Sequence, residues 1–136
     1  MKKEVIVAVS GYFDPIHVGH LKYLKLAKNL GDKLIVIINN NLQAELKKGE
    51  FFMHEKDRME IVAALRFVDE VFLSVDTDGS VCKSLEIIKP DIFANGGDRS
   101  LDEIPETAVM KKYNIKMVDG LGSKIRSSSD LTGIGK

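Results

Sequence analysis

The chain has little of what marks secreted or membrane-embedded proteins. Its 136 residues include a single cysteine, Cys82, so no disulfide can form within the chain, and a reducing compartment is the simpler expectation. The first apolar run, at positions 5–9, is too short for the apolar region of a signal peptide and far too short to span a membrane. We therefore expect a cytoplasmic protein with no membrane partner.

The chain also lacks an excess of either charge. Its 20 basic and 20 acidic residues give a formal net charge of zero. A broad nucleic-acid-binding surface needs a basic excess, so no nucleic-acid partner is expected. A local basic pocket for a small phosphorylated ligand remains compatible with this balance.

No internal repeat, low-complexity segment or linker divides the sequence. With 136 residues, 44% of them hydrophobic, we expect one domain over residues 1–136 with one sizeable core. Short runs rich in β-branched residues alternate with longer helical patterns. The expected strands cover residues 5–10, 33–39, 68–74, 91–94 and 115–118, and the expected helices cover residues 18–30, 54–66, 80–89 and 103–113.

This alternation predicts an α/β fold. We expect a Rossmann-like five-stranded parallel sheet of order 3-2-1-4-5, with right-handed crossovers and helices on both faces. The polar stretch at positions 40–53 is the longest expected loop, and long loops within compact domains are often functional.

The most informative segment is GYFDPIHVGH, residues 11–20, which joins the first expected strand to the first expected helix. His17 and His20 lie three residues apart, which places them on one helical face. The carboxyl end of a strand is where ligands bind in open α/β sheets, and a helix start suits phosphate. Metal binding is the rival interpretation. Helical zinc pairs usually have four-residue spacing and no strong third ligand lies nearby, so no metal site is predicted.

The pattern Gly11-x-Phe13-Asp14-x-x-His17-x-Gly19-His20 resembles the HxGH signature of the nucleotidylyltransferase superfamily. The resemblance extends over nearly the whole chain. It implies an enzyme that moves a nucleoside monophosphate from CTP or ATP to a small phosphate- or phosphonate-bearing acceptor and releases pyrophosphate. A Mg²⁺ ion would accompany the triphosphate, and a homodimer would match many relatives.

The resemblance also implies roles for the residues of this segment. His17 and His20 would be catalytic, contacting the triphosphate and stabilising the charge that develops on it. The other matched positions would bind the nucleotide: Gly11, Tyr12, Phe13, Asp14 and Gly19.

Two basic positions further along match the family as well. A lysine of the middle loop would clamp the phosphates; Lys47 is preferred over its neighbour Lys48 and is counted as catalytic. Arg58, in the next expected helix, would bind the nucleotide. The simpler interpretations are a solvated loop and a charge on a helix surface.

Two later motifs complete the nucleotide site that the resemblance implies. Asn95, Gly97, Asp98 and Arg99 follow the fourth expected strand and would line the pocket for ribose and base. Ser127, Ser128 and Ser129 would bind the β- or γ-phosphate at the start of a last helix, although Arg126 stands where the family commonly has isoleucine. A plain glycine-rich turn and an ordinary helix cap are the alternatives.

The base is less well defined than the reaction. The combined motifs look most like phosphonate-type cytidylyltransferases, so CTP is slightly favoured. The alternative is an ATP-using adenylyltransferase of the heptose-phosphate, FMN or pantetheine-phosphate type. A non-catalytic nucleotide-binding regulator on the same fold is a further alternative, whereas a flavodoxin-like redox domain would leave the paired histidines unexplained.

Overall fold

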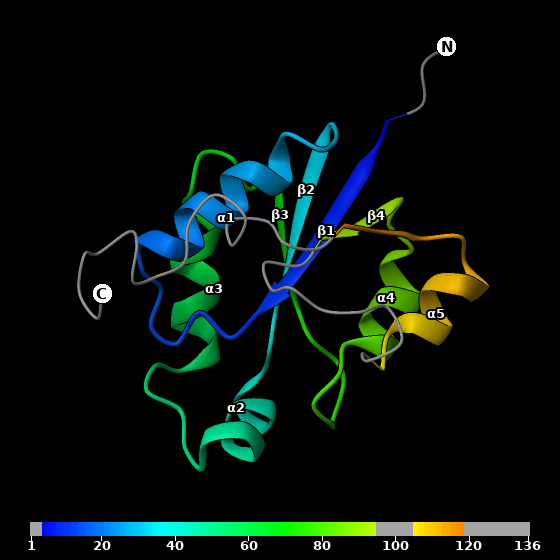
Figure 1. The fold of residues 1–136 in the computed structure, drawn as a ribbon. Helices are drawn as coiled ribbons and strands as arrows, with labels where there is room; N and C mark the ends of the chain where they lie inside the picture. The colour runs from blue at the N-terminus through cyan, green and yellow to red at the C-terminus, as the bar shows by residue number, and fades with distance from the viewer. Residues whose placement is uncertain (1–3, 95–104, 119–136) are drawn as a thin grey trace, which may run out of the picture.

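Five parallel strands form the centre of the computed structural model, which describes residues 4–94 and 105–118 (Figure 1). The sheet order is β3-β2-β1-β4-β5, and every pair is parallel, as the sequence predicted. The strands are β1 (Ile6–Gly11), β2 (Lys33–Ile38), β3 (Glu70–Leu73), β4 (Ile92–Ala94) and β5 (Lys116–Val118). The helices are α1 (Val18–Lys28), α2 (Asn41–Lys48), α3 (Glu55–Ala63), α4 (Cys82–Ile88) and α5 (Thr107–Lys112).

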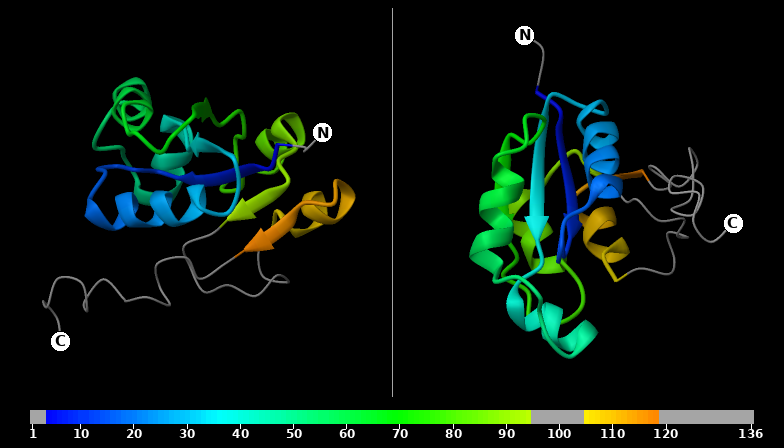
Figure 2. Two further views of the ribbon diagram at one scale, coloured as in Figure 1. Left: turned by 90° about the horizontal axis from the view of Figure 1, so that it is seen from above. Right: turned by 90° about the vertical axis from the view of Figure 1, so that its left-hand side faces the viewer.

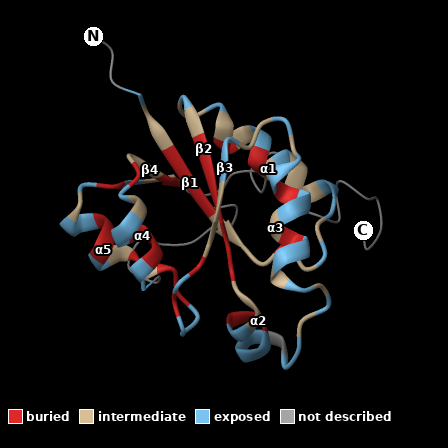
Figure 3. Cartoon of the chain, turned by 180° about the vertical axis from the view of Figure 1, so that it is seen from behind, coloured by how far each residue is buried: buried red, intermediate tan, exposed pale blue. Residues whose placement is uncertain are grey.

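The sheet separates two hydrophobic layers. Successive residues of a strand point to opposite faces, so Val7 and Val9 pack on the side of α1 and α3, whereas Ala8 packs on the side of α4 and α5. Figure 2 shows these helix pairs on either side of the sheet, and Figure 3 shows the buried residues gathered on the strands and on the inner helix faces. Strand β2 is buried along nearly its whole length, which explains its continuous apolar sequence.

The strand order places a topological switch point between β1 and β4. The chain leaves β1 towards β2 and later returns on the other side of β1 to form β4, so a crevice opens at the carboxyl ends of these two strands. The Tyr23 hydroxyl of α1 donates a hydrogen bond to the carbonyl oxygen of Ala94 at 3.1 Å. This contact fixes α1 against the carboxyl end of β4.

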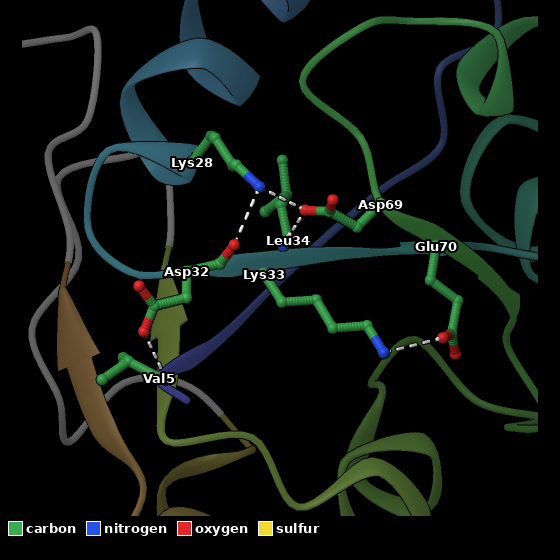
Figure 4. Close-up of polar contacts among 7 residues, drawn as sticks. All are labelled: Val5, Lys28, Asp32, Lys33, Leu34, Asp69 and Glu70. Carbon is green, nitrogen blue, oxygen red and sulfur yellow. Dashed lines mark hydrogen bonds and ion pairs between the residues drawn. The ribbon is translucent and has the colours of Figure 1, made fainter. Parts of the chain in front are cut away.

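The opposite, amino-terminal edge of the sheet is closed by polar contacts (Figure 4). The Lys28 ammonium pairs with the Asp69 carboxylate and donates to the Asp32 carbonyl oxygen at 2.9 Å. Asp69 accepts the Leu34 N–H at 2.7 Å, and Asp32 accepts the Val5 N–H at 2.8 Å. The hydrogen bond from Lys28, followed by that from Leu34, lowers the pKa of Asp69 despite some opposing desolvation. These contacts order the strand starts, at the edge remote from the crevice.

Helix α2 corrects the sequence prediction, which gave residues 40–53 as a loop. The helix begins with a capping box. The Asn40 side chain accepts the Gln43 N–H at 2.9 Å, and the Gln43 side chain accepts the Asn40 N–H at 3.1 Å. The helix ends at Gly49, whose φ of 86° is the left-handed conformation typical of helix ends.

Candidate active site

The turn that follows β1 is built around a buried phenylalanine. Phe13 is 1% exposed and has a φ of 50°, which is uncommon for a residue with a side chain. Its ring folds back beneath Gly11, where an added Cβ would lie 2.9 Å from the ring. Gly11 is therefore needed for packing, and the turn delivers His17 to the position before α1.

His17 and His20 cap the first turn of α1. His17 Nδ1 accepts the N–H of Gly19 at 3.1 Å, and His20 Nδ1 accepts the N–H of His17 at 3.0 Å. An added Cβ on Gly19 would lie 3.0 Å from His17 Cε1, so this glycine makes room for the ring. A nitrogen that accepts a hydrogen bond carries no proton, so we assign the neutral ring proton to Nε2 in both histidines. Each ring can then offer one N–H donor to a ligand.

The surroundings keep His20 uncharged. Burial, followed by repulsion from His17, lowers the pKa of His20 to about 4. Its ring also contacts the Phe13 ring edge to face, with centroids 4.8 Å apart. At neutral pH, His20 is therefore a neutral hydrogen-bond donor rather than an imidazolium, which suits stabilisation of negative charge on a phosphoryl group.

A cavity of about 540 Å³ opens next to this turn, on the sheet face that carries α4 and α5. It lies among the ends of β1 and β2, helix α2, the segment before α4 and the residue before α5. Its lining residues are Ser10, Gly11, Tyr12, Asn39, Gln43, Leu46, Lys47, Gly79, Val81 and Glu106. The volume is that of a typical small-molecule site.

Lys47, the lysine of this segment to which the sequence analysis gives preference, lines this cavity from helix α2 rather than from a loop. Its side chain is exposed, and Nζ lies 4.7 Å from the centroid of the Tyr12 ring. Burial raises the pKa of Tyr12, so its hydroxyl stays protonated. The ammonium group of Lys47, the phenol of Tyr12 and the carboxyl end of β1 thus lie around the same cavity.

Arg58 has a different place from the one predicted. Its side chain is not on the helix surface but 1% exposed. The guanidinium donates to the carbonyl oxygens of Tyr12 at 2.8 Å, Asn39 at 2.7 Å and Met53 at 3.0 Å, and to Asn41 Oδ1 at 2.9 Å. These bonds occupy four of its five N–H groups, so Arg58 holds the turns after β1 and β2 together. It therefore has no pair of N–H groups left to bind a nucleotide phosphate.

Asp14 also acts inside the protein. Its carboxylate accepts the N–H of Phe52 at 2.8 Å and of Met53 at 2.6 Å. The histidine turn is thereby fastened to the segment that joins α2 to α3. We conclude that Asp14 positions that segment, on which the placement of Lys47 depends.

A network of amides that the sequence analysis missed fixes α2 over the sheet edge. Gln43 is fully buried, and its Nε2 donates to the carbonyl oxygens of Asp78 at 2.7 Å and Ser80 at 2.8 Å. Asn40 Nδ2 donates to the Ser74 carbonyl oxygen at 2.9 Å. The pairing of Asn40 with Gln43 three residues later is a capping-box pattern, and it was the available sequence signal.

The remaining predicted residues lie outside the described part of the chain. These are Asn95, Gly97, Asp98, Arg99, Ser127, Ser128 and Ser129. Within residues 4–94 and 105–118, no three His, Cys, Asp or Glu side chains are grouped as a metal site would require. No helix in the same ranges is long and apolar enough to cross a membrane.

Comparisons with known proteins find relatives along most of the chain. A family model described as cytidylyltransferase-like matches residues 8–130. The chain is 40% identical over 118 residues to an FAD synthase of Thermococcus sibiricus, covering 84% of this chain and 77% of the relative. It is 36% identical over 116 residues to the bifunctional protein HldE of Methylobacillus flagellatus, covering 84% of this chain but only 23% of that protein.

A solved structure has the same fold. It is titled the lipopolysaccharide core biosynthesis protein from Thermoplasma volcanium, and it aligns with a TM-score of 0.73 at 30% sequence identity. The alignment covers 86% of this chain and 96% of that one. The parallel sheet and its crossovers are therefore shared along almost the full length of that structure.

Proposed function

Because the chain belongs to the cytidylyltransferase-like family and is a nucleotidyltransferase, we propose that it transfers AMP from ATP to the phosphate of FMN, releasing pyrophosphate. The observation that supports the reaction type is the pair His17 and His20, whose Nδ1 atoms accept backbone N–H groups, so that each Nε2 can donate to a phosphoryl oxygen; the turn before them contributes Gly11 and Tyr12 to the cavity that Lys47 lines. The choice of ATP as the nucleotide and of FMN as the acceptor is based on the names of the relatives. The sequence motifs slightly favoured CTP, whereas the FAD synthases, which are 40% and 42% identical to this chain, support the alternative with ATP.

The chemistry needs charge stabilisation more than covalent work. An oxygen of the acceptor phosphate bonds to the α-phosphorus of ATP, while the bond from that phosphorus to the bridging oxygen of the β-phosphate breaks. Pyrophosphate leaves with the electron pair, and no proton need move during the transfer. Negative charge spreads over the phosphoryl oxygens, where preorganised N–H donors are most effective. His17 and His20 would supply two such donors.

The two substrates would approach from different sides of the end of β1. The histidines lie on the face of α1 and α3, and the cavity lies on the face of α4 and α5. ATP would place its α-phosphate at the histidines, and the acceptor would occupy the cavity. Lys47 would draw the acceptor phosphate and the triphosphate together at the mouth of the cavity.

Nucleotidyltransferases of this kind typically use a divalent metal together with the triphosphate. Mg²⁺ would be bound mainly by phosphate oxygens and water. When bound, it would neutralise part of the triphosphate charge. The contribution of His17, His20 and Lys47 described above is separate from it.

A phosphorylated sugar is the second candidate acceptor. The Thermoplasma volcanium structure is titled a lipopolysaccharide core biosynthesis protein, and its 30% identity extends over 86% of this chain. The same transfer of AMP would then produce a sugar linked to ADP. The cavity alone is roomy enough for either acceptor.

A matrix of substrates tests this proposal. The purified protein is incubated with Mg²⁺, with ATP or CTP, and with FMN or sugar 1-phosphates, and pyrophosphate and the coupled product are both measured. We expect FAD from ATP and FMN, with CTP at least tenfold poorer, a difference of about 1.4 kcal/mol in transition-state binding. Product from CTP alone would restore the first expectation. Absence of pyrophosphate with every pair would exclude the proposed enzyme activity.

A further inference from the structure

Glu106 lies in the wall of the cavity with only part of its carboxylate in use. The residue is 7% exposed, and its Oε2 accepts the N–H of Val81 at 2.9 Å. In the described part of the chain, Oε1 accepts no hydrogen bond from protein. Every fully enclosed side-chain oxygen and nitrogen among those residues has a partner, so Oε1 is not sealed in the core. Glu106 lines the cavity, and Oε1 is the part of its carboxylate that remains available to a ligand there.

Capping of α4 does not account for the unused oxygen. Asp76 already serves the first turn of this helix, because its carboxylate accepts the N–H of Lys83 at 2.8 Å and the N–H of Ser84 at 3.0 Å. Both of its oxygens are used, and it does not line the cavity. Burying a carboxylate that is only partly hydrogen-bonded is costly, so a ligand that completes its bonding would be favoured.

The cavity wall carries two opposite charges at different positions, which would orient a charged ligand. Among its described lining residues, only Lys47 and Glu106 carry a formal charge. Lys47 comes from α2 and Glu106 from the turn before α5, so one cation and one anion belong to different elements. A phosphate is drawn to Lys47 and repelled by Glu106, and an acceptor therefore has one preferred orientation.

We propose that Glu106 is a specificity-determining residue, whose Oε1 accepts a hydrogen bond from a hydroxyl or ring N–H on the part of the acceptor remote from its phosphate. This inference rests on the proposed function, because it assumes that the cavity holds the acceptor. FMN carries both kinds of donor, on its ribityl chain and at ring position N3. Glu106 would select acceptors that pair a phosphate with such a neutral donor.

The Glu106→Gln variant tests the inference directly. Its amide oxygen can still accept the Val81 N–H, but an NH₂ group replaces the acceptor Oε1. We expect the KM for FMN to rise about 10- to 100-fold, the range for losing a hydrogen bond to a charged group, with an unchanged KM for ATP and an unchanged Tm. The matched control is Asp76→Asn, which weakens the other carboxylate cap of α4 and should lower Tm without raising the KM for FMN. A KM for FMN within twofold of wild type in Glu106→Gln would overturn the inference.

An FMN analogue identifies which hydrogen-bond donor of FMN binds Glu106. With 3-methyl-FMN, the ring N–H is replaced by a methyl group. If Glu106 binds this N–H, the wild-type enzyme uses 3-methyl-FMN poorly and Glu106→Gln has no further effect on it. If Glu106 binds a ribityl hydroxyl, the variant weakens both flavins equally. An equal rise in the KM for ATP would contradict either form.

Direct binding separates this inference from the proposed function. Quenching of FMN fluorescence reports binding without turnover. If the wild-type protein binds FMN but makes no FAD, the proposed activity fails, and weaker FMN binding by Glu106→Gln at unchanged Tm still supports the role of Glu106. Equal binding by the two proteins, or no FMN binding by either, overturns it.

Discussion

The imidazole rings of His17 and His20 are stacked, with centroids 3.9 Å apart and planes inclined by 28°. Each ring uses Nδ1 to accept a backbone N–H of the same helical turn, and within the described residues the two Nε2 atoms bind no partner, so they can donate to a ligand. Stacking disfavours two positive charges so close together. The pair is consequently suited to donate hydrogen bonds from neutral rings.

Replacing His20 in two ways separates its two hydrogen bonds. In His20→Asn, the side-chain oxygen can take the place of Nδ1 and accept the His17 N–H, but the Nε2–H donor is lost; in His20→Ala, both are lost. We expect kcat to fall about 100- to 1,000-fold in both variants. Only His20→Ala should also lose about 0.5–2 kcal/mol of unfolding free energy, measured in urea. A His20→Asn enzyme with nearly full kcat would show that Nε2 is not used.

The pH dependence of stability should report the burial of His20. Its pKa is about 4 in the folded protein, below its ordinary value of 6.5, so only the unfolded chain takes up the proton between these values. The free energy of unfolding should therefore decrease as the pH falls from about 6.5 to about 4, with no further loss from this group below that.

Urea unfolding of wild type and His20→Asn from pH 4 to pH 7 isolates this effect, because the other titrating groups are common to both proteins. The stability of wild type relative to the variant should fall on acidification. A constant difference across this range would contradict the lowered pKa.

Lys47 should matter for turnover and not for folding. Its side chain is exposed, so Lys47→Met should change the unfolding free energy by no more than about 0.5 kcal/mol. Loss of its charge from the cavity should reduce kcat/KM at least tenfold, because both substrates carry phosphate. Lys25→Met, on the exposed face of α1, is the matched control and should leave both quantities unchanged. If Lys48→Met alone reduces kcat/KM, the neighbouring lysine serves instead.

Arg58 should be needed for stability first. Arg58→Lys keeps the charge but cannot reproduce bonds to three carbonyl oxygens and Asn41, and it leaves buried acceptors unpaired. We expect a loss of about 2–4 kcal/mol in unfolding free energy, measured by urea denaturation. The exposed Arg66, changed to Lys, is the control and should have almost no effect. A fully stable Arg58→Lys with a raised KM for ATP would instead favour the predicted nucleotide contact.

The sheet was predictable because its signals are local. Runs such as 34–38 are apolar throughout, which is typical of a strand buried on both faces. The turn before α1 was also predictable, since six of the ten residues from Gly11 to His20 match a known motif. Its hydrogen bonds add the reason for Gly19, which clears space for the His17 ring.

The way in which helix α2 is held and the place of Arg58 could not be predicted from the sequence, for a physical reason. Both depend on polar partners far along the chain: Gln43 binds carbonyl oxygens 35 and 37 positions away, and Arg58 binds Tyr12, 46 positions away. Apolar periodicity cannot report such contacts, because amides and guanidinium groups ordinarily count as surface residues. Glu106 escaped notice likewise, since its partner Val81 lies on another element.

The proposed placement of ATP and the acceptor on opposite faces of the sheet has a stereochemical consequence. If ATP is held at the histidines and the acceptor enters from the cavity, the incoming and departing oxygens lie on opposite sides of the α-phosphorus. A single in-line displacement of that kind inverts the configuration at the α-phosphorus. A single diastereomer of ATP with sulfur in place of one α-phosphate oxygen should therefore yield a product of inverted configuration at that phosphorus. Inversion would follow from the placement of the two substrates on opposite faces of the sheet.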